Sequence, residues 1–548
     1  MARREKLVYG WRDPVPTRPA ATVLLLRDGD EGLEVLMTRR SQTASFAPGV
    51  YVFPGGAIDA ADASPQARAR SRLRDSQPEN LRTASTAAIR EAFEELGVLL
   101  AYRPDGTLAV ADDVAKLDRS RDADFLPQLE VHGYTMAVDR VWSFCHWITD
   151  RDLPKRFDVQ FLVAPMPPTQ EPVADEGEQF EPVWIRPAHA LERHERGDFS
   201  MIFPTIRTLG RLAQMPTVAS VLEACSGDRP LWVSSPRGAY VRGDIERFAE
   251  HEPAFGEIEL VSPDGQLVHT LDWQHDKAVP LLRNVQRLTC NNPGRMTGPG
   301  TNTFIVGEPG AYAVIDPGPL EPAHVERIAS IVGKDLRYIL CTHAHPDHSP
   351  GAALLKEMTG APILGAPSGP NFRSEWQFTP DRTLAHGERL SLGDSTLRVI
   401  HTPGHASNHL CFLLEEDGLL FAGDHINNGS TVVIDPPDGN MREYLKALEA
   451  LLDEPIEYIL PAHGWVIGFA HAAIRHLIAH RLKREAKVSA AVKSAGRATL
   501  EQLLPRVYDD VDPVIHPVAA RSLLAHLEKL HGDGIVTLAD GHWTLAAA

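Results

Sequence analysis

The first 212 residues alternate short apolar runs with polar turns. The runs 20–27 and 33–39 enclose the polar segment 28–32, a pattern that predicts a β-hairpin. Residues 85–96 follow a helical spacing between Ser85, a good N-cap residue, and Gly97, a typical C-terminal stop. Further strands are predicted at 157–164 and 182–185, a helix near 204–214, and a polar, arginine-rich loop at 64–84. Together these elements indicate a mixed α/β unit.

A longer alternation of strands and helices begins at residue 302. Strands are predicted at 302–306, 312–316, 337–341, 396–400, 410–414, 419–422 and 457–460, and helices at 321–332, 349–358 and 441–452. This order is typical of a layered α/β sandwich. From residue 472 the pattern becomes helical, and the chain ends in a hairpin that turns at Asp540-Gly541. Helices followed by a terminal hairpin predict a winged helix.

Length and composition set the domain count and exclude several classes of protein. The chain has 548 residues, which suggests three or four domains. We expect them at 15–212, 216–283, 284–470 and 471–548, where 216–283 has a weak pattern and reads as a linker module of unknown role. A net charge of −18 argues against a surface that is basic throughout and binds duplex nucleic acid. Five scattered cysteines, no leader-like apolar start and no long apolar run predict a cytoplasmic protein without a membrane segment.

Histidine and aspartate residues cluster where strands of the second half end. Three imidazoles and one carboxylate fall within residues 343–348, directly after the apolar strand 338–341. Three more such residues each follow a later strand. The complete set is His343, His345, Asp347, His348, His405, Asp424 and His463. Neutral imidazoles and carboxylates suit zinc, manganese or ferrous iron, and seven ligands with Asp424 as a bridge supply two ions that can activate water.

The same residues resemble the ligand motif of the metallo-β-lactamase superfamily, and the resemblance covers about 284–470. It implies an αββα sandwich in which His343, His345 and His405 hold one metal. By the same pattern Asp347, His348 and His463 hold the other metal, and Asp424 bridges the two. The superfamily includes lactamases, thioesterases, lactonases, nucleases and oxidoreductases, so the resemblance implies hydrolysis but does not name the substrate.

A narrower resemblance points to one branch of that superfamily. The segments 292–294, 300–304, 429–433 and 461–464, the helix 480–485 and a winged helix at about 483–548 are similar to the lactamase-β-like endoribonucleases. This similarity implies cleavage of phosphodiesters in single-stranded RNA. Basic residues at 476–497 could hold the phosphate backbone, or they could form an ordinary solvated helix face. Few basic residues occur at 519–530, which argues against sequence-specific DNA reading.

Glycine and glutamate residues form a second candidate site near the N-terminus. Gly55 and Gly56 stand in a loop after an apolar pair, and the helix 85–96 carries Arg90, Glu91, Glu94 and Glu95. Glu91 and Glu95 share a helix face because they are four residues apart. Clustered carboxylates suit magnesium or manganese and could face a diphosphate. Arg90 is placed to orient a glutamate by ion pairing.

These residues resemble the glycine loop and helix of the Nudix box, and the resemblance covers about 15–212. Segments 142–147, 156–158 and 203–205, with a long insertion before Arg90, are similar to the coenzyme-A-diphosphatase-like branch. The resemblance implies an αβα domain that hydrolyses a nucleoside-diphosphate derivative, such as coenzyme A. The first acidic position is Asp62 instead of glutamate, which leaves open a Nudix-shaped module that only binds its ligand.

The sequence therefore predicts a soluble multidomain α/β and α+β protein, with a Nudix-like αβα domain, an αββα sandwich and a C-terminal winged helix. Asp347, Asp424, Glu91, Glu94 and Glu95 are its candidate catalytic residues, and Gly55, Gly56 and Arg90 its candidate ligand-binding residues. RNA is the first candidate substrate of the sandwich. The alternative is a glyoxalase-II-like thioesterase or lactonase with a regulatory Nudix-like module and a tail that forms a homodimer. Iron–oxygen chemistry is a weaker option.

Overall fold

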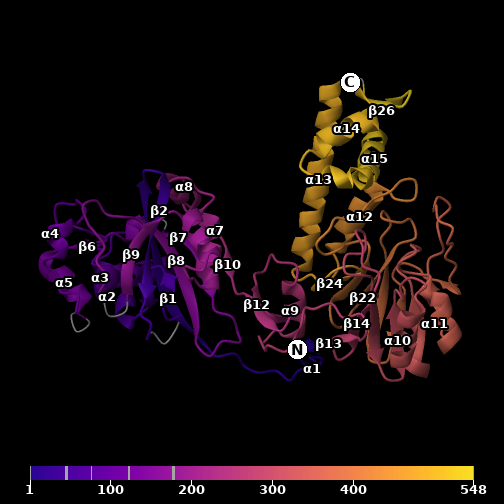
Figure 1. The fold of residues 1–548 in the computed structure, drawn as a ribbon, viewed down its shortest axis with the longest axis horizontal. Helices are drawn as coiled ribbons and strands as arrows, with labels where there is room; N and C mark the ends of the chain where they lie inside the picture. Colours follow the sequence, from indigo (N-terminus) through magenta and orange to yellow (C-terminus); the bar gives the residue numbers. More distant parts are fainter. Residues whose placement is uncertain (1, 44–46, 76, 121–123, 176–178, 547–548) are drawn as a thin grey trace. The chain divides into compact units, whose positions relative to one another are not determined.

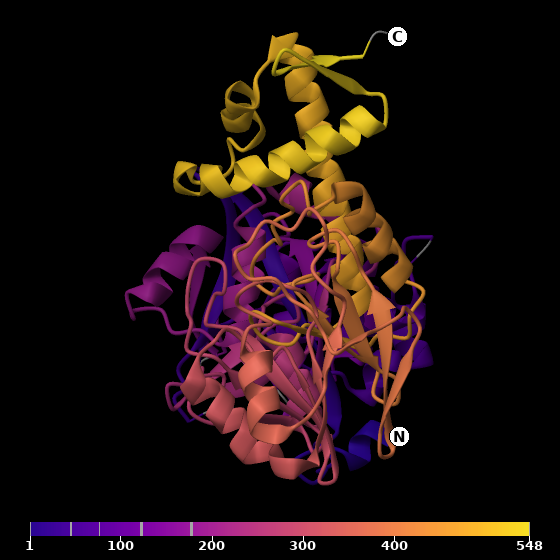
Figure 2. The same cartoon turned by 90° about the vertical axis from the view of Figure 1, so that its right-hand side faces the viewer.

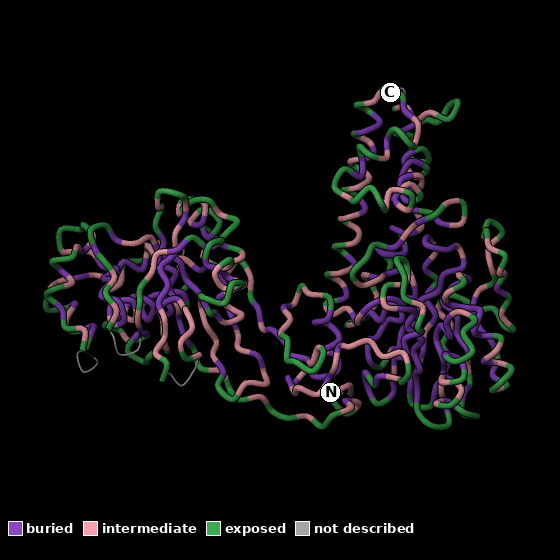
Figure 3. Tube along the Cα trace, viewed as in Figure 1, coloured by how far each residue is buried: buried purple, intermediate pink, exposed green. Residues whose placement is uncertain are grey.

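The computed structural model describes residues 2–43, 47–75, 77–120, 124–175 and 179–546. The chain divides at Pro236 into two units (Figure 1). The first unit is Pro14–Pro236, and the second unit joins Met1–Asp13 to Arg237–Ala548. In each unit the buried positions concentrate along the strands and on the helix faces that cover them (Figure 3). In the described part of the chain, no helix combines the length and apolar character needed to cross a membrane.

A mixed sheet forms the centre of the first unit. Its main path runs β10-β7-β8-β1-β2-β3, with β4 paired to β1 and β9 paired to β2. The strands are β1 (Thr17–Gly29), β2 (Gly32–Arg40), β3 (Tyr51–Val52), β4 (Gly55–Ala57), β7 (Trp142–Ile148), β8 (Arg156–Pro165), β9 (Gln179–Ile185) and β10 (Val233–Ser234). The predicted hairpin is confirmed as β1 and β2, which pair antiparallel up to Gly29 and Gly32.

Both faces of this sheet are buried because β1 is apolar at consecutive positions. Val23 and Leu25 contribute to one core together with helix α3 (Glu79–Leu96), while Leu24 and Leu26 contribute to the opposite core. The second face is covered by α6 (Pro187–Glu195), α7 (Phe203–Leu212) and α8 (Val218–Ala224). The first face also receives η1 (Ala60–Ala63), α2 (Pro65–Ala69), β5 (Ala101–Tyr102), α4 (Ala111–Val114), α5 (Phe125–His132), β6 (Thr135–Met136) and η2 (Val138–Arg140). Strands buried on two faces read as continuous apolar runs.

The prediction that helix 85–96 begins at Ser85 is wrong. Helix α3 begins at Glu79 with Pro78 as its N-cap, and Ser85 is a fully buried interior residue. The arginine-rich segment before it is also not one loop, because α2 lies within it. Small residues such as Ala84 and Ser85 let the first turns of α3 pack closely on the sheet. The C-terminal stop at Gly97 is confirmed by its left-handed backbone.

Two stacked sheets form the body of the second unit. The first sheet is β13 (Val279–Leu282), β14 (Val285–Thr289), β15 (Asn302–Glu308), β16 (Ala311–Ile315), β17 (Leu336–Leu340), β18 (Ile363–Gly365) and β19 (Arg382–Thr383), in that order. The second is β20 (Arg389–Leu392), β21 (Ser395–His401), β22 (Leu410–Leu414), β23 (Leu419–Gly423) and β24 (Tyr458–Pro461). Apolar side chains from both sheets share one core, in which the rings of Phe304 and Phe421 lie 5.1 Å apart.

Helices cover the outer face of each sheet, which completes the predicted αββα order. Helices α10 (Pro322–Val332) and α11 (Gly351–Thr359), with η3 (Gly333–Asp335) between them, pack on the first sheet. Helix α12 (Met441–Leu451) and the start of α13 (Ala470–Ala495) pack on the second. All seven strands predicted between residues 302 and 460 are present, and β13, β14 and β18 to β20 are additional.

The C-terminal helices and hairpin form a small domain at the end of α13 (Figure 2). They are β25 (Arg497–Ala498), α14 (Leu500–Val507), η4 (Pro513–Ile515), α15 (His516–Gly532), β26 (Val536–Ala539) and β27 (His542–Leu545). The predicted winged helix is confirmed in this arrangement. Helix α15 also contacts the sandwich, because Ala525 joins the core of α12 and Arg442 forms an ion pair with Asp533.

The segment 216–283, expected as a separate module, is divided between the two units. Helix α8 and β10 belong to the first unit. The hairpin β11 (Arg237–Val241) and β12 (Asp244–Phe248), helix α9 (Phe255–Val261) and β13 belong to the second. The N-terminal residues, with α1 (Ala2–Glu5), also join the second unit, since Leu7 lies in its core and Lys6 Nζ lies 2.7 Å from Asp417 Oδ2. The pattern of apolar positions along the sequence cannot show that the N-terminal residues pack on the second unit, from which the whole first unit separates them in the chain.

Candidate functional site

All seven predicted metal-ligating residues lie in loops that follow strands at one edge of the sandwich. His343, His345, Asp347 and His348 follow β17, which pairs in parallel with β16 and β18. His405 follows β21, Asp424 follows β23 and His463 follows β24. Because β23 and β24 are parallel neighbours, Asp424 and His463 emerge side by side. The alternation of strands and helices therefore brings residues 120 positions apart in the chain into one site.

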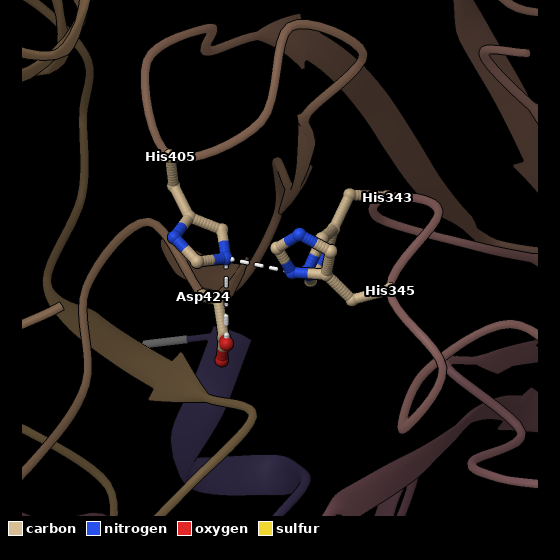
Figure 4. A group of neighbouring side chains, drawn as sticks. All are labelled: His343, His345, His405 and Asp424. Carbon is tan, nitrogen blue, oxygen red and sulfur yellow. Dashed lines mark hydrogen bonds and ion pairs between the residues drawn. The ribbon is translucent and has the colours of Figure 1, made fainter. Parts of the chain in front are cut away.

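One group of donors gathers around His345 (Figure 4). The ligand atoms of His343, His345, His405 and Asp424 all lie within 4.8 Å of one another. Nδ1 of His345 lies 2.8 Å from Nε2 of His343 and 3.0 Å from Nε2 of His405. Asp424 Oδ2 lies 3.6 Å from His405 Nε2. Ring nitrogens converging on one point form a donor set for a soft or borderline cation.

A second group shares Asp424 with the first. Asp347, His348, Asp424 and His463 also have ligand atoms within 4.8 Å of one another. Nε2 of His463 lies 3.2 Å from Asp424 Oδ1 and 3.4 Å from Asp347 Oδ2. Nε2 of both His348 and His463 is buried and has no hydrogen-bond partner in the described structure. Buried ring nitrogens without a partner are costly unless a cation or a proton satisfies them. The residues present therefore fit two divalent ions with Asp424 between them.

The electrostatics of the two groups agree with this fit. Burial and the neighbouring imidazoles lower the pKa of His343, and they lower that of His345 to about 3, which leaves both rings neutral with free lone pairs. Burial also acts on His463, but the carboxylates of Asp424 and Asp347 outweigh it and raise its pKa to about 9. A carboxylate that holds protons on its neighbours in this way offers a strong site for positive charge. Ligand imidazoles and carboxylates must be deprotonated to bind metal.

Two residues that the sequence analysis did not single out hold these ligands in place. Asp316, after β16, accepts hydrogen bonds from the backbone N–H and the hydroxyl of Thr342, and its Oδ2 lies 3.0 Å from His348 Nδ1. Asn302 donates from Nδ2 to the carbonyls of Pro461 and Gly464, on either side of His463. Outer partners of this kind fix the ring orientation of metal ligands. The only sequence signal for either is a polar residue at a strand end.

Three other histidines near the ligands differ in their surroundings. His409 and His425 are fully buried behind the site, and the hydroxyl of Thr402 lies 2.9 Å from His409 Nδ1. Burial lowers the pKa of both, to about 3 for His425, so they pack as neutral rings. His401 is exposed, and its Nε2 lies 3.3 Å from the carbonyl of Ser407. None of the three belongs to either donor group.

In the first unit, Arg90 on α3 organises the predicted acidic cluster. Its guanidinium donates to Asp62 through Nε and Nη2, both at 3.1 Å, and to the carbonyl of Ala57 at 2.9 Å. Nη1 donates to Glu91 at 2.8 Å and to Glu94 at 3.1 Å. Asp62 is a buried bidentate partner of the arginine despite being one methylene shorter than glutamate. One guanidinium therefore contacts three carboxylates, and its single positive charge offsets one of their three negative charges.

The glycine loop lies directly against this cluster. Gly55 donates its N–H to Glu95 Oε2 at 3.1 Å, and a Cβ added to Gly56 would collide with the carboxylate of Glu91. Burial raises the pKa of Glu95 to about 8, against hydrogen bonds from Gln179 and Gly55 that lower it. The structure thus brings Gly55, Gly56, Arg90 and the three glutamates together. Magnesium binding here stays a prediction, because both donor groups that the described residues form lie in the second unit.

The basic residues of α13 that were candidates for holding RNA are largely engaged within the fold. Arg481 is buried, donates to the carbonyl of Val432 and lies over the ring of Tyr444. Arg484 forms a two-point ion pair with Asp510 at 2.7 and 3.2 Å, and Lys487 pairs with Asp509. A guanidinium held by a carboxylate has less charge to offer a phosphate. Arg481 therefore anchors α13 to the sandwich, whereas Arg484 and Lys487 anchor it to the winged helix.

Comparisons with known proteins agree with this geometry. Residues 296–463 match the family model of the metallo-beta-lactamase superfamily, and residues 499–543 match the beta-lactamase associated winged helix domain. An atrochrysone carboxyl ACP thioesterase of Aspergillus chevalieri is 32% identical over 46% of this chain and 85% of its own length. The lactamase-like protein nscB of Trichophyton rubrum is 30% identical over 53% of this chain and 90% of its own. A solved NUDIX hydrolase of Alicyclobacillus acidocaldarius is 29% identical, covers 39% of this chain and 96% of its own, and has a TM-score of 0.35.

Proposed function

The chain belongs to the metallo-β-lactamase superfamily of hydrolases, and from this premise we propose that its second unit hydrolyses acyl thioesters. The observation that carries the proposal is the likeness to a named thioesterase over most of that relative's length. The ion pairs of α13 support it, because they engage basic side chains that an RNA strand would need. Cleavage of single-stranded RNA, which the sequence favoured, becomes the competing outcome of the same test.

The residues present assign distinct roles within such a reaction. His343, His345 and His405 would hold one divalent ion, Asp347, His348 and His463 the other, and Asp424 both. When bound, the ions activate water and polarise the thioester carbonyl. Asp347 is the most exposed of the carboxylate ligands, with 27% of its side chain accessible, against 13% for Asp424. Asp347 is therefore the more accessible of the two carboxylates to a substrate that approaches from solvent.

The test compares the full-length protein with one variant on three substrates. Wild type and Asp424→Ala, each supplied with zinc or manganese, receive an acyl-CoA thioester, free coenzyme A and single-stranded RNA. We expect thioester cleavage by the wild type and its loss in the variant. His401→Ala is the matched control, since His401 is close in sequence to His405 but outside both donor groups. RNA cleavage lost in Asp424→Ala, with the thioester untouched, would replace the proposal with the nuclease function.

For the first unit we propose a Nudix-like module that binds a nucleoside-diphosphate derivative such as coenzyme A. The contacts of Arg90 with Asp62, Glu91 and Glu94 favour binding over hydrolysis, because a catalytic magnesium would have to compete with the guanidinium for these carboxylates. Calorimetric titration of coenzyme A with magnesium present tests binding, and product analysis tests cleavage. We expect binding without cleavage in the wild type. Cleavage that disappears in Glu94→Gln would establish a Nudix hydrolase instead.

A further inference from the structure

A cavity of about 600 Å³ lies beside the candidate metal centre in the second unit. Three segments form its walls: the loop 426–431 that follows Asp424, the first turns of α13, and residues 250–256 before α9. The volume is within the range of pockets that hold small organic ligands. The third wall comes from the second-unit part of the segment 216–283, to which no role has been assigned.

The cavity connects to the metal centre through two adjacent asparagines. Asn427 lines the cavity, and its Nδ2 donates to Asp424 Oδ1 at 3.2 Å. Asn428 also lines it, and its backbone N–H donates to the carbonyl of His463 at 3.2 Å. A ligand in the cavity would therefore lie against residues that are bonded directly to Asp424, which both donor groups share, and to His463.

The wall at 250–256 is fixed firmly to the sandwich. Asn428 Nδ2 donates to the carbonyl of Pro253 at 2.8 Å. Gly256 packs so closely on Gly468 that a Cβ would collide with the backbone, and the rings of Phe255 and Phe469 stack at 6.1 Å. Behind them Glu257 is fully buried, bonded to Arg287 and His269, and accepts the N–H of Val466. These contacts hold residues 250–256 in place, so they form a fixed wall of the cavity.

The lining is apolar inside and carries neutral polar groups at the rim. Ile426, Ile467 and Leu477 contribute apolar surface. His251, Ser430, Thr431 and His476 are exposed at the rim, and in the described structure their side chains form no hydrogen bond. The lining includes Glu250 and Glu252 but neither lysine nor arginine. Such a surface suits an uncharged chain with oxygen substituents and disfavours phosphate.

We propose that this cavity binds the acyl chain of the thioester substrate, with residues 250–256 as a specificity wall. The assignment rests on the proposed thioesterase function and adds its substrate class: uncharged acyl groups of medium length that carry hydroxyl or keto oxygens. The thiol carrier, with its phosphates, remains outside the cavity. Residues 250–256, which the sequence placed in a module of unknown role, thus belong to the substrate site of the hydrolase.

The experiment varies only the acyl group. Metal-loaded full-length protein receives coenzyme A thioesters of acetyl, hexanoyl, decanoyl and 3-hydroxydecanoyl groups. Ala473→Trp fills the cavity from α13, and His251→Trp fills it from the opposite wall. Ala479→Trp is the matched control, because Ala479 is exposed on the same helix and does not line the cavity. Thermal unfolding of each variant checks that it is folded.

We expect the wild type and Ala479→Trp to prefer the decanoyl substrates. Both filling variants should lose at least about tenfold in kcat/KM for these substrates, with a much smaller loss for acetyl, since each buried methylene contributes that much discrimination or more. An equal loss for every acyl length, or no loss, would overturn the assignment while leaving the thioesterase intact. A wild type that cleaves none of the thioesters would overturn the proposed function, and this assignment with it.

Discussion

The two units compensate the negative charge of their clustered carboxylates in opposite ways. Each gathers several carboxylates, and none of the side chains in either cluster is more than 34% exposed. In the first unit the chain supplies its own cation, Arg90, which touches Asp62, Glu91 and Glu94 at once. In the second unit no arginine or lysine pairs with Asp347 or Asp424 among the described residues, and their ion-pair partners there are all imidazoles.

This difference indicates which of the two sites depends on an external metal ion. A buried carboxylate needs a compensating charge, and the type of side chain around it decides where that charge comes from. An imidazole carries no permanent charge, and the proton that Asp424 and Asp347 hold on His463 can give way to a metal ion. The second unit is thus arranged for metal, whereas the carboxylates of the first unit already share one fixed cation, Arg90. The four predictions that follow test this contrast.

Removal of the metal should reveal the largest difference in behaviour between the two units. Dialysis against a strong chelator should abolish hydrolysis by the second unit, a loss on the order of 1000-fold, because the residues there cannot activate water alone. It should also lower the free energy of unfolding of this unit by about 3 kcal/mol if zinc was present at 100 times its Kd. Hydrogen exchange of peptides from each unit measures the effect. Equal loss of protection in the first unit would contradict the contrast.

Replacing Arg90 should make the first unit dependent on an external ion. Arg90→Met leaves Asp62 and Glu91 without their partner, and their side chains are only 2% and 15% exposed. Removing one partner of a buried pair costs about 3–5 kcal/mol. Magnesium or manganese should restore part of this stability in urea unfolding. Arg193→Met is the control, because its pair with Asp198 is largely exposed and contributes at most about 1 kcal/mol. A variant that magnesium does not rescue would show that Arg90 serves packing alone.

Asn302 offers a weaker test, on the second unit alone. Asn302→Ala removes the two hydrogen bonds that fix the loop around His463. We expect zinc to bind about 10–100-fold more weakly, as measured by competition with a chromophoric chelator. Activity should fall at limiting zinc and largely recover at saturating zinc. Asn291→Ala is the control, since Asn291 is exposed. A zinc Kd within twofold of wild type would refute this role.

The sequence predicted the strands of the sandwich and the gathering of the seven ligands because both follow from local patterns. Apolar runs of strand length precede each ligand, and strand ends at one edge of a sheet lie close together. The hairpin of the first unit was equally clear. Helix α3 was predicted six residues short, because Glu79–Ala84 is polar at its start and Ser85 resembles a cap.

What the sequence left open depends on contacts between distant segments. Asp316 and Asn302 support the ligands through partners 32 and 159 residues away, and neither stands in a distinctive local pattern. Residues 250–256 join the sandwich through Gly256 and a carbonyl of Pro253, which no periodicity records. The basic stretch of α13 suggested RNA binding because it looks unpaired in the local sequence. Its acidic partners, Asp509 and Asp510, follow some 20 residues later.

Finally, one buried group in each unit, Glu95 and His324, should contribute a pH dependence of stability, and the two contributions should have opposite signs. Burial raises the pKa of Glu95 in the first unit from 4.5 to about 8, so between these values the folded state holds a proton that the unfolded state releases. Raising the pH through this window therefore destabilises the first unit. Burial, with the charge of Arg327, lowers the pKa of His324 in the second unit from 6.5 to about 4, so acidification through that window destabilises the second unit.

Single substitutions isolate each contribution. Glu95→Gln should gain stability over the wild type at pH 8.5 and little at pH 5, and Gln179 can rotate its amide to keep the hydrogen bond. His324→Gln should be less sensitive than the wild type between pH 6.5 and 4.5 and unchanged above it. On either side of the pH range, the contribution of each group to the free energy of unfolding should change by at most about 1.4 kcal/mol per pH unit. Urea unfolding in chelator at pH 4.5, 6.5 and 8.5 measures both differences. If both substitutions altered stability on the same side of the pH range, the pKa shift assigned to one of the two groups would have the wrong sign, because an acid with a raised pKa and a base with a lowered pKa lose stability in opposite directions of pH.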